Sequence, residues 1–344
     1  MKCIYCEHDA MYPARASGHC PNCNKAYAFE PRTGSAFSDM AFKSAIDAVS
    51  AGGTVRFLPE HVQYELQRRK RRGKGPSHLA FAIAGGSALL ALATPLAILV
   101  AVVFGSVGLA MRPSDHIGDG SFQSDWARWC SVHGNPVGLI VRRQTAAKAS
   151  EPYRGGDEME QYSFDRAVIC DRPETVDLLL ANNFHFENNC AVLSRDGYPP
   201  RAFDTVKRML RQNPKLTVYA LHDATFAGCS LAQELASSPD WFQGRARVVE
   251  VGIRPGHTTR LRGLWTAPSP APYSVTALTA AEQKWLASHS AELFAIRPEQ
   301  VIKRLFKAIT SDVDALSRDA DVWTDKKSLA VESATSDGGD DAFG

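Results

Sequence analysis

Two aspartates of this 344-residue chain stand where a predicted β-strand ends, a place where carboxylates can hold a metal ion. Asp171 ends an apolar strand predicted over 165–171, and Asp223 follows another strand predicted over 216–221. Ligands of parallel sheets collect at the carboxyl ends of the strands, so both side chains should reach the same edge. Carboxylate oxygens are suitable ligands for Mg²⁺. The two residues therefore predict a magnesium site.

Residues next to the two aspartates could assist catalysis at such a site, and the aspartates themselves also have a structural interpretation. Glu174 and His222 are near enough along the chain to assist in catalysis. Alternatively, Asp171 caps a helix that begins near Pro173, because an aspartate before a helix accepts backbone N–H bonds. Asp223 would then cap the following helix less directly, and His222 would be a packed residue at the edge of the sheet.

Four cysteines form a second chemical pattern, two CxxC knuckles separated by 13 residues. Cys3 and Cys6 make the first knuckle, and Cys20 and Cys23 make the second. Each knuckle places two thiolates on one side of a tight turn, and four thiolates complete a tetrahedral Zn²⁺ site. This site has no open position, so the zinc would be structural and would fold a ribbon of residues 1–34. Disulfide bonds are the alternative, and an expected cytosolic location argues against them.

The elements that must position the two aspartates alternate between strand and helix, which implies a parallel sheet with right-handed crossovers. A helix and a strand over 121–143 would lead into this sheet. The predicted order from there is strand 165–171, helix 174–182, strand 191–194, helix 201–212, strand 216–221, a helix around 230–236 and strand 247–253. The sequence therefore predicts an α/β domain.

Three short motifs follow the first three strands. They are Cys170-Asp171-Arg172, Gly197-Tyr198-Pro199, and Leu221-His222-Asp223-Ala224-Thr225 with Gly228 after it. In these motifs the stretch of roughly 160–255 resembles the Toprim domain, in the version found in the topoisomerase VI A subunit family. The resemblance implies a Toprim-like fold, a divalent metal held by the acidic residues, and nucleic acid as a partner.

The chain departs from that family's pattern at two positions. The family's metal-binding glutamate at the end of the first strand is replaced by the shorter Asp171. The second aspartate of the family's Asp-x-Asp motif is replaced by the uncharged Thr225. One ligand is shortened and one is neutral, so we do not expect two-metal chemistry. The resemblance still implies a single weak Mg²⁺ site at Asp171 and Asp223.

The segment 77–112 is predicted to enter a membrane, because residues 79–111 carry no charge. One continuous helix would be about 50 Å long, beyond a hydrocarbon core of about 30 Å, and Pro95 lies near its middle. The alternatives are one long tilted helix and a transmembrane hairpin. A basic run over 68–74 places the N-terminal side in the cytoplasm. We favour the hairpin, because it keeps both soluble parts in the cytoplasm at a bacterial inner membrane.

The residues between the ribbon and this segment, 35–76, predict two helices, over 39–50 and 59–72. A short glycine-containing turn joins them, an outline typical of a helix-turn-helix. Tyr64 falls in the second helix, at a place comparable to the nucleophilic tyrosine of the topoisomerase VI A family. A packing role for this tyrosine is the alternative.

Together these segments predict a multidomain chain. A Toprim-like domain over 113–275 would follow the membrane segment, with C-terminal helices over 276–316 and a disordered acidic tail over 317–344. The net charge of +2 excludes a general polycation. The uncharged membrane segment offers no polar pathway, which argues against a transporter.

Two functions are consistent with this organisation. The first is a membrane-anchored cytosolic Toprim-like protein that binds or scaffolds a protein partner, another copy of itself or a nucleic acid. The second is a Mg²⁺-dependent nuclease or DNA-processing enzyme that uses Asp171 and Asp223. Thr225 favours the first function, and the retained aspartate pair favours the second.

Overall fold

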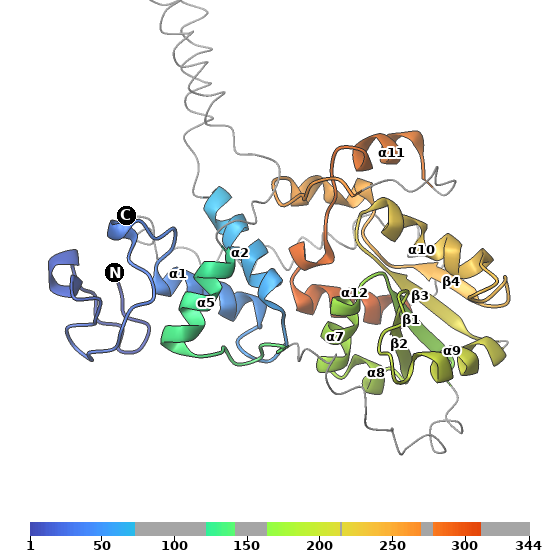
Figure 1. Ribbon diagram of the computed structural model, residues 1–344, viewed down its shortest axis with the longest axis horizontal. Coiled ribbons are helices and arrows are strands. Elements are labelled where there is room, and N and C mark those ends of the chain that lie inside the picture. Colours follow the sequence, from blue (N-terminus) through green and yellow to red (C-terminus); the bar gives the residue numbers. More distant parts are fainter. Residues whose placement is uncertain (73–121, 142–163, 214, 270–277, 311–344) are drawn as a thin grey trace, which may run out of the picture.

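The computed structural model describes residues 1–72, 122–141, 164–213, 215–269 and 278–310 (Figure 1). The predicted membrane segment at 77–112 and the predicted acidic tail at 317–344 lie outside these residues. Among the helices that are described, none is long and apolar enough to cross a membrane.

A four-stranded parallel sheet forms the centre of the C-terminal part, in the order β2-β1-β3-β4. The strands are β1 (Arg166–Cys170), β2 (Cys190–Ser194), β3 (Thr217–Leu221) and β4 (Arg247–Glu250). β1 and β3 are neighbours, with Cys170 opposite Leu221, so the residues that follow these strands emerge at the same edge. The predicted parallel α/β arrangement is confirmed.

Helices cover both faces of the sheet (Figure 1). On one face lie α7 (Pro173–Ala181), α8 (Phe184–Glu187) and α12 (Pro298–Thr310), and on the other lie α9 (Phe203–Gln212) and α10 (Phe226–Ser237). Successive strand residues point to opposite faces, so Val168 packs in the first core and Ile169 in the second. The domain therefore has three layers, and α12 belongs to the same core as the sheet.

The segment before α12 is less helical than the C-terminal helices predicted over 276–316. Helix α11 (Ala280–Leu286) is short, and the chain then runs extended to a 3₁₀ turn, η5 (Leu293–Ala295). The extended part pairs with the segment just after β3, since Ala224 N donates to Ala291 O at 2.8 Å. This pairing keeps the backbone out of a helix, although the apolar spacing favours one.

The N-terminal part contains the cysteine ribbon and α1 (Asp39–Val49), α2 (Pro59–Arg72) and α5 (Phe122–His133). Both helices predicted over 39–50 and 59–72 are confirmed, and Ser38 caps the first. The strand that the sequence predicts before the sheet does not lead into it. Ile140 N donates to Phe57 O at 2.9 Å, so this segment pairs with the linker between α1 and α2 and not with the sheet. Likewise α5 packs on α1, where Trp129 stacks on Phe42 with ring centroids 4.8 Å apart.

Helix α2 is packed against the α/β domain. An apolar cluster joins Tyr64 of α2 to Leu264 and to Phe294 of η5. The buried Glu65 accepts hydrogen bonds from Arg297 at 3.1 Å and from Arg69 at 3.0 Å. Arg69 belongs to the basic run, so part of that run stabilises the protein internally as well as marking the approach to the predicted membrane segment.

Candidate functional site

The four predicted zinc ligands converge in the ribbon. Their Sγ atoms all lie within 4.8 Å of one another, with 3.7 Å between Cys3 and Cys23 and 3.6 Å between Cys6 and Cys20. A tetrahedral site with Zn–S bonds of about 2.3 Å separates its sulfurs by about 3.8 Å. A disulfide would bring two sulfurs to about 2.05 Å. The cluster could therefore bind a metal such as zinc, and its geometry is not that of disulfide bonds.

Both knuckles have the same backbone geometry. Glu7 N donates to Cys3 O at 3.0 Å, and Asn24 N donates to Cys20 O at 2.9 Å. Glu7 and Asn24 both have a positive φ, of 57° and 56°. This left-handed residue after each CxxC turns the chain back and leaves the two sulfurs on one side.

A buried carboxylate joins the ribbon to the helices. Asp39 accepts backbone hydrogen bonds from Ala28 at 3.0 Å and from Phe29 at 2.7 Å. His133 Nε2 lies 2.8 Å from Asp39 Oδ2, and its Nδ1 lies 2.9 Å from the hydroxyl of Tyr5 in the first knuckle. The ribbon is thus held against α1 and α5 at several points, and its fold should affect their stability.

Replacing Cys20 with serine should abolish metal binding and unfold the ribbon. Thiolate–zinc bonds supply about 10–16 kcal/mol of apparent binding free energy, which in a segment this small is folding free energy. We expect zinc analysis to fall from one ion per chain to none, and hydrogen exchange of the amides in 1–34 to become fast. His19→Ala, a nearby side chain outside the cluster, should retain the zinc. Full zinc content in Cys20→Ser would contradict the assignment.

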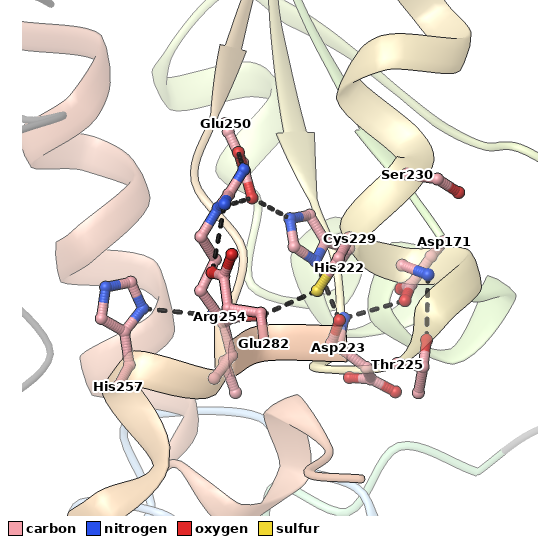
Figure 2. Close-up of polar contacts among 12 residues, drawn as sticks. Asp171, His222, Asp223, Thr225, Cys229, Ser230, Glu250, Arg254, His257 and Glu282 are labelled. Carbon is pink, nitrogen blue, oxygen red and sulfur yellow. Dashed lines mark hydrogen bonds and ion pairs between the residues drawn. The ribbon is translucent and has the colours of Figure 1, made fainter. Parts of the chain in front are cut away.

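The two aspartates meet at the carboxyl edge of the sheet, which we call the rim. Asp171 Oδ2 accepts a hydrogen bond from Asp223 N at 2.8 Å (Figure 2). Asp171 Oδ1 is buried and has no hydrogen-bond partner among the described residues. Gly228 permits this approach, because a Cβ there would lie 2.4 Å from Asp223 O and 3.0 Å from Asp171 Oδ2.

The capping roles considered for the two aspartates are wrong. The N-cap of α7 is Arg172, and that helix end has no side-chain cap bond. The N-cap of α10 is Thr225, whose Oγ1 accepts a hydrogen bond from Gly228 N at 2.9 Å. Thr225, at the position where the Toprim resemblance places a third acid, therefore has a structural role of its own.

Both carboxylate oxygens of Asp223 accept hydrogen bonds from other residues of the protein. Its Oδ1 accepts from Leu293 N at 2.7 Å, and its Oδ2 accepts from Arg172 Nη1 at 3.0 Å. The same Arg172 nitrogen lies 2.9 Å from Glu292 Oε1, whereas Arg172 Nε is 3.9 Å from Glu174. The guanidinium thus bridges Asp223 and Glu292, and Glu174 is peripheral. Among the described residues, only the four cysteines bring three or more metal-ligand atoms together.

The rim carboxylates are electrostatically unfavourable when ionised. Burial raises the pKa of Asp171, and the positive charge of His222 offsets this in part. Burial also raises the pKa of Asp223 well above its usual value, and the neighbouring Asp171 raises it further. Two buried carboxylates in contact favour a bound proton or a bound cation.

His222 lies fully buried behind the rim. Its Nδ1 donates to the carbonyl of Asp223 at 2.8 Å, and its Nε2 donates to Glu250 Oε1 at 3.1 Å (Figure 2). Burial lowers the pKa of His222, but hydrogen bonds with Cys229 and Glu250 raise it well above its usual value. Both ring nitrogens face acceptors, which favours the charged imidazolium form. It positions the Asp223 peptide and does not reach a ligand directly.

Replacing Gly252 with alanine should displace the His222 ring and destabilise the α/β domain by about 3 kcal/mol, through overpacking and a broken buried hydrogen bond. A Cβ at this position would lie 2.3 Å from His222 Cδ2. Gly256→Ala is the matched control, because a Cβ there meets nothing within 4 Å. Urea unfolding of both variants measures the difference. Equal stability would show that His222 has room to move.

A pocket of about 440 Å³ lies over the rim, between α2 and the α/β domain. It is lined by Gln63, Tyr64, Asp171, Arg172, Arg195, Asp223, Thr225, Ala227, Thr266, Ala267, Ser269, Ser290 and Glu292. Tyr64 reaches this wall, as the resemblance implies, but its hydroxyl donates to Glu292 Oε2 at 3.1 Å. Burial and the charge of Glu292 raise the pKa of Tyr64, which makes it a poor nucleophile.

Sequence reasoning missed the part that Arg195 and Glu292 play in this pocket. Arg195 directly follows the second strand, and this position in the sequence could have placed it at the same edge as the two aspartates. Glu292 comes from the segment before η5, which the sequence predicts as helix.

No known protein family, no curated protein and no solved structure matches this chain. The functional conclusions therefore rest on the four-cysteine cluster, the parallel sheet and the geometry of the rim.

Proposed function

We propose that this chain is a membrane-anchored binding protein whose Toprim-like α/β domain holds a ligand or partner and does not cleave it. Zn²⁺ in the ribbon is structural, and residues 77–112 form the anchor, a hairpin in a bacterial inner membrane. Both soluble parts then lie in the cytoplasm. The observation that carries the proposal is the pair of hydrogen bonds that the Asp223 carboxylate accepts from Leu293 N and Arg172.

Metal-dependent phosphodiester cleavage needs carboxylates that can coordinate the ion or ions at the scissile phosphate. Asp223 has both oxygens occupied by internal donors, and Thr225 is used as a helix cap. Of the two aspartates, Asp171 keeps one oxygen, Oδ1, without a hydrogen-bond partner among the described residues. A single carboxylate supports one loosely held Mg²⁺, which usually keeps several waters and relies on the ligand's own oxygens.

The arrangement of the domains also suits a binding role. The pocket has walls from α2 and from the α/β domain, so a ligand there contacts both. The contacts of Glu65 with Arg297 and of Tyr64 with Glu292 keep these walls together. A protein partner, a second copy of the chain or a nucleic acid would therefore meet one continuous surface.

A Mg²⁺-dependent nuclease or DNA-processing enzyme is the second candidate. It is favoured by the unpartnered Oδ1 of Asp171, which lies beside a pocket that also contains Arg195. In this alternative Asp171 and Asp223 hold the metal, which requires Arg172 to give up its contact with Asp223.

The experiment that separates the two is a cleavage assay with the zinc-loaded full-length protein in detergent. The full chain is needed because α2 supplies one wall of the pocket. With DNA and RNA in Mg²⁺ or Mn²⁺, we expect no cleavage above the level of a metal-free control. Cleavage that disappears in Asp171→Asn and Asp223→Asn, and survives in the exposed Asp196→Asn, would establish the nuclease instead.

A further inference from the structure

We propose that the rim pocket binds a small phosphorylated molecule, about the size of a mononucleotide, together with one divalent cation. This inference rests on the proposed function, since the pocket is the same, and it adds the class of ligand. Three features carry it: the N-terminal end of a helix beside a loosely held arginine, an unsatisfied carboxylate beside that helix end, and the size of the pocket.

The anion side is the first turn of α10. Helix N-termini attract anions, because the helix dipole is positive there. In α10 the N–H of Gly228 is already bonded to Thr225 Oγ1, so the dipole and Arg195 supply the attraction. Ala227, in this turn, lines the pocket, and Arg195 Nη1 lies 3.4 Å from Ala227 O. The ion pairs of Arg195 with Asp196 and Glu234 are both 3.5 Å long. Charge-assisted bonds are usually about 2.7–2.9 Å, so this guanidinium is loosely held and can turn to a phosphoryl group.

The cation side is Asp171, which lines the same pocket and is only 9% exposed. Its Oδ1 has no partner among the described residues. Its Oδ2 lies against the same turn of α10, 3.0 Å from where a Cβ of Gly228 would be. An anion at the helix end would therefore lie beside a carboxylate, and a divalent cation between them satisfies both. Mg²⁺ is commonly bound in this way, by one or two carboxylates and the phosphate oxygens of the ligand.

The dimensions favour a small ligand. A volume of about 440 Å³ falls within the range of about 300–1,000 Å³ found for small-molecule sites. Gln63 and Tyr64 of α2 form the facing wall, and the bond from Tyr64 to Glu292 fixes it in place.

The rest of the wall is polar: Arg172 pairs with Asp223 and Glu292, and the other residues are uncharged. Gln63, Thr266 and Ser269 contribute amide and hydroxyl groups. Such groups fix the orientation of a ligand's polar atoms, here sugar hydroxyls and base edges. Inorganic phosphate alone would leave most of the pocket empty, so the ligand is an organic phosphate.

The test is calorimetric titration of the zinc-loaded full-length protein in detergent with AMP, ADP, inorganic phosphate and a 20-mer DNA duplex, each with and without Mg²⁺. We expect saturable binding of AMP or ADP that is at least about tenfold weaker without Mg²⁺ and at least about tenfold weaker in Arg195→Gln. In Asp171→Asn the effect of Mg²⁺ on binding should disappear. Lys303→Gln, on the exposed side of α12, should bind as the wild type does.

Two results would overturn the inference. If the duplex binds through Arg195 and AMP and ADP do not compete with it, the ligand is a nucleic acid. If Mg²⁺ binds through Asp171 but no nucleotide binds at millimolar concentration, the proposed binding function survives and the ligand class is wrong. Failure of the proposed function itself has a different signature, namely cleavage of the nucleic acid.

Discussion

Replacing Glu65 with alanine should lower the free energy of unfolding by about 3 kcal/mol and loosen α2 from the α/β domain. Glu65 is 3% exposed and accepts hydrogen bonds from Arg69 at 3.0 Å and Arg297 at 3.1 Å. Without the carboxylate, these guanidinium groups lose the buried negative charge that they share. Removing one partner of a buried ion pair is costly for this reason.

The pH dependence of this effect identifies its cause. Burial by itself raises the pKa of Glu65. The charges of Arg68 and Arg297 outweigh burial, and the net result is a pKa lowered from 4.5 to about 2. The folded pKa lies below the unfolded one, so the stabilisation is present above about pH 4.5 and is lost as the pH falls toward 2. The difference between wild type and Glu65→Ala should therefore be constant near pH 7 and shrink below pH 4.5.

Urea unfolding at pH 7 and at pH 3 measures this difference. Asp47→Ala is the control, because Asp47 pairs with Lys43 on the surface and is 50% exposed. An exposed pair of this kind contributes about 0.5 kcal/mol or less. If Glu65→Ala is no more destabilising than Asp47→Ala, the contact between α2 and the α/β domain does not depend on this ion pair.

Asp171→Asn should have the opposite sign and stabilise the metal-free protein at pH 7.5 by about 1–2 kcal/mol. The asparagine oxygen can still accept the hydrogen bond from Asp223 N, which is 2.8 Å from Asp171 Oδ2 in the wild type. The substitution removes a buried charge beside a second buried carboxylate. A residue that lowers stability at its own position is typical of a functional site.

The pH dependence again fixes the sign. Burial raises the pKa of Asp171 above its unfolded value, so its contribution to stability is present at low pH and is lost as the pH rises through the folded pKa. The advantage of Asp171→Asn should therefore be largest at high pH and vanish near pH 4. Thermal unfolding of the zinc-loaded protein at several pH values, in buffer without Mg²⁺ or Mn²⁺, tests this. Asp196→Asn, which is 59% exposed, should change little. A destabilised Asp171→Asn at every pH would mean that Asp171 is a structural residue.

Adding Mg²⁺ should reverse the order of the two proteins. A cation stabilises only a folded state that binds it. The gain in the free energy of unfolding grows with the ratio of the Mg²⁺ concentration to the dissociation constant. The wild type should therefore gain stability with Mg²⁺ while Asp171→Asn does not.

The sheet and the placement of the two aspartates could be predicted because they depend on local patterns. The apolar runs that end at Cys170 and Leu221 have strand length and are separated by helical periodicity, so the carboxyl ends had to share an edge. The four cysteines were equally predictable, since CxxC spacing nearly determines their geometry.

The state of the rim could not be predicted, because it depends on contacts distant in sequence. Glu292 lies in a stretch with helical spacing. The backbone of the preceding residue, Ala291, pairs with Ala224, and this pairing brings Glu292 to Arg172. Thr225 could equally be a lost metal ligand or a helix cap on the sequence alone, and the structure shows the cap. The helix α5 was assigned to the sheet domain because it precedes it, whereas its tryptophans find their aromatic partners on α1.

The most direct test of the rim is the number of Mn²⁺ ions that the zinc-loaded full-length protein binds, measured by electron paramagnetic resonance in parallel with Asp171→Asn. We expect one weakly held Mn²⁺ per chain in the wild type, and none in Asp171→Asn. Two Mn²⁺ ions, or one ion that Asp171→Asn still binds, would contradict the claim that the rim holds a single cation through Asp171.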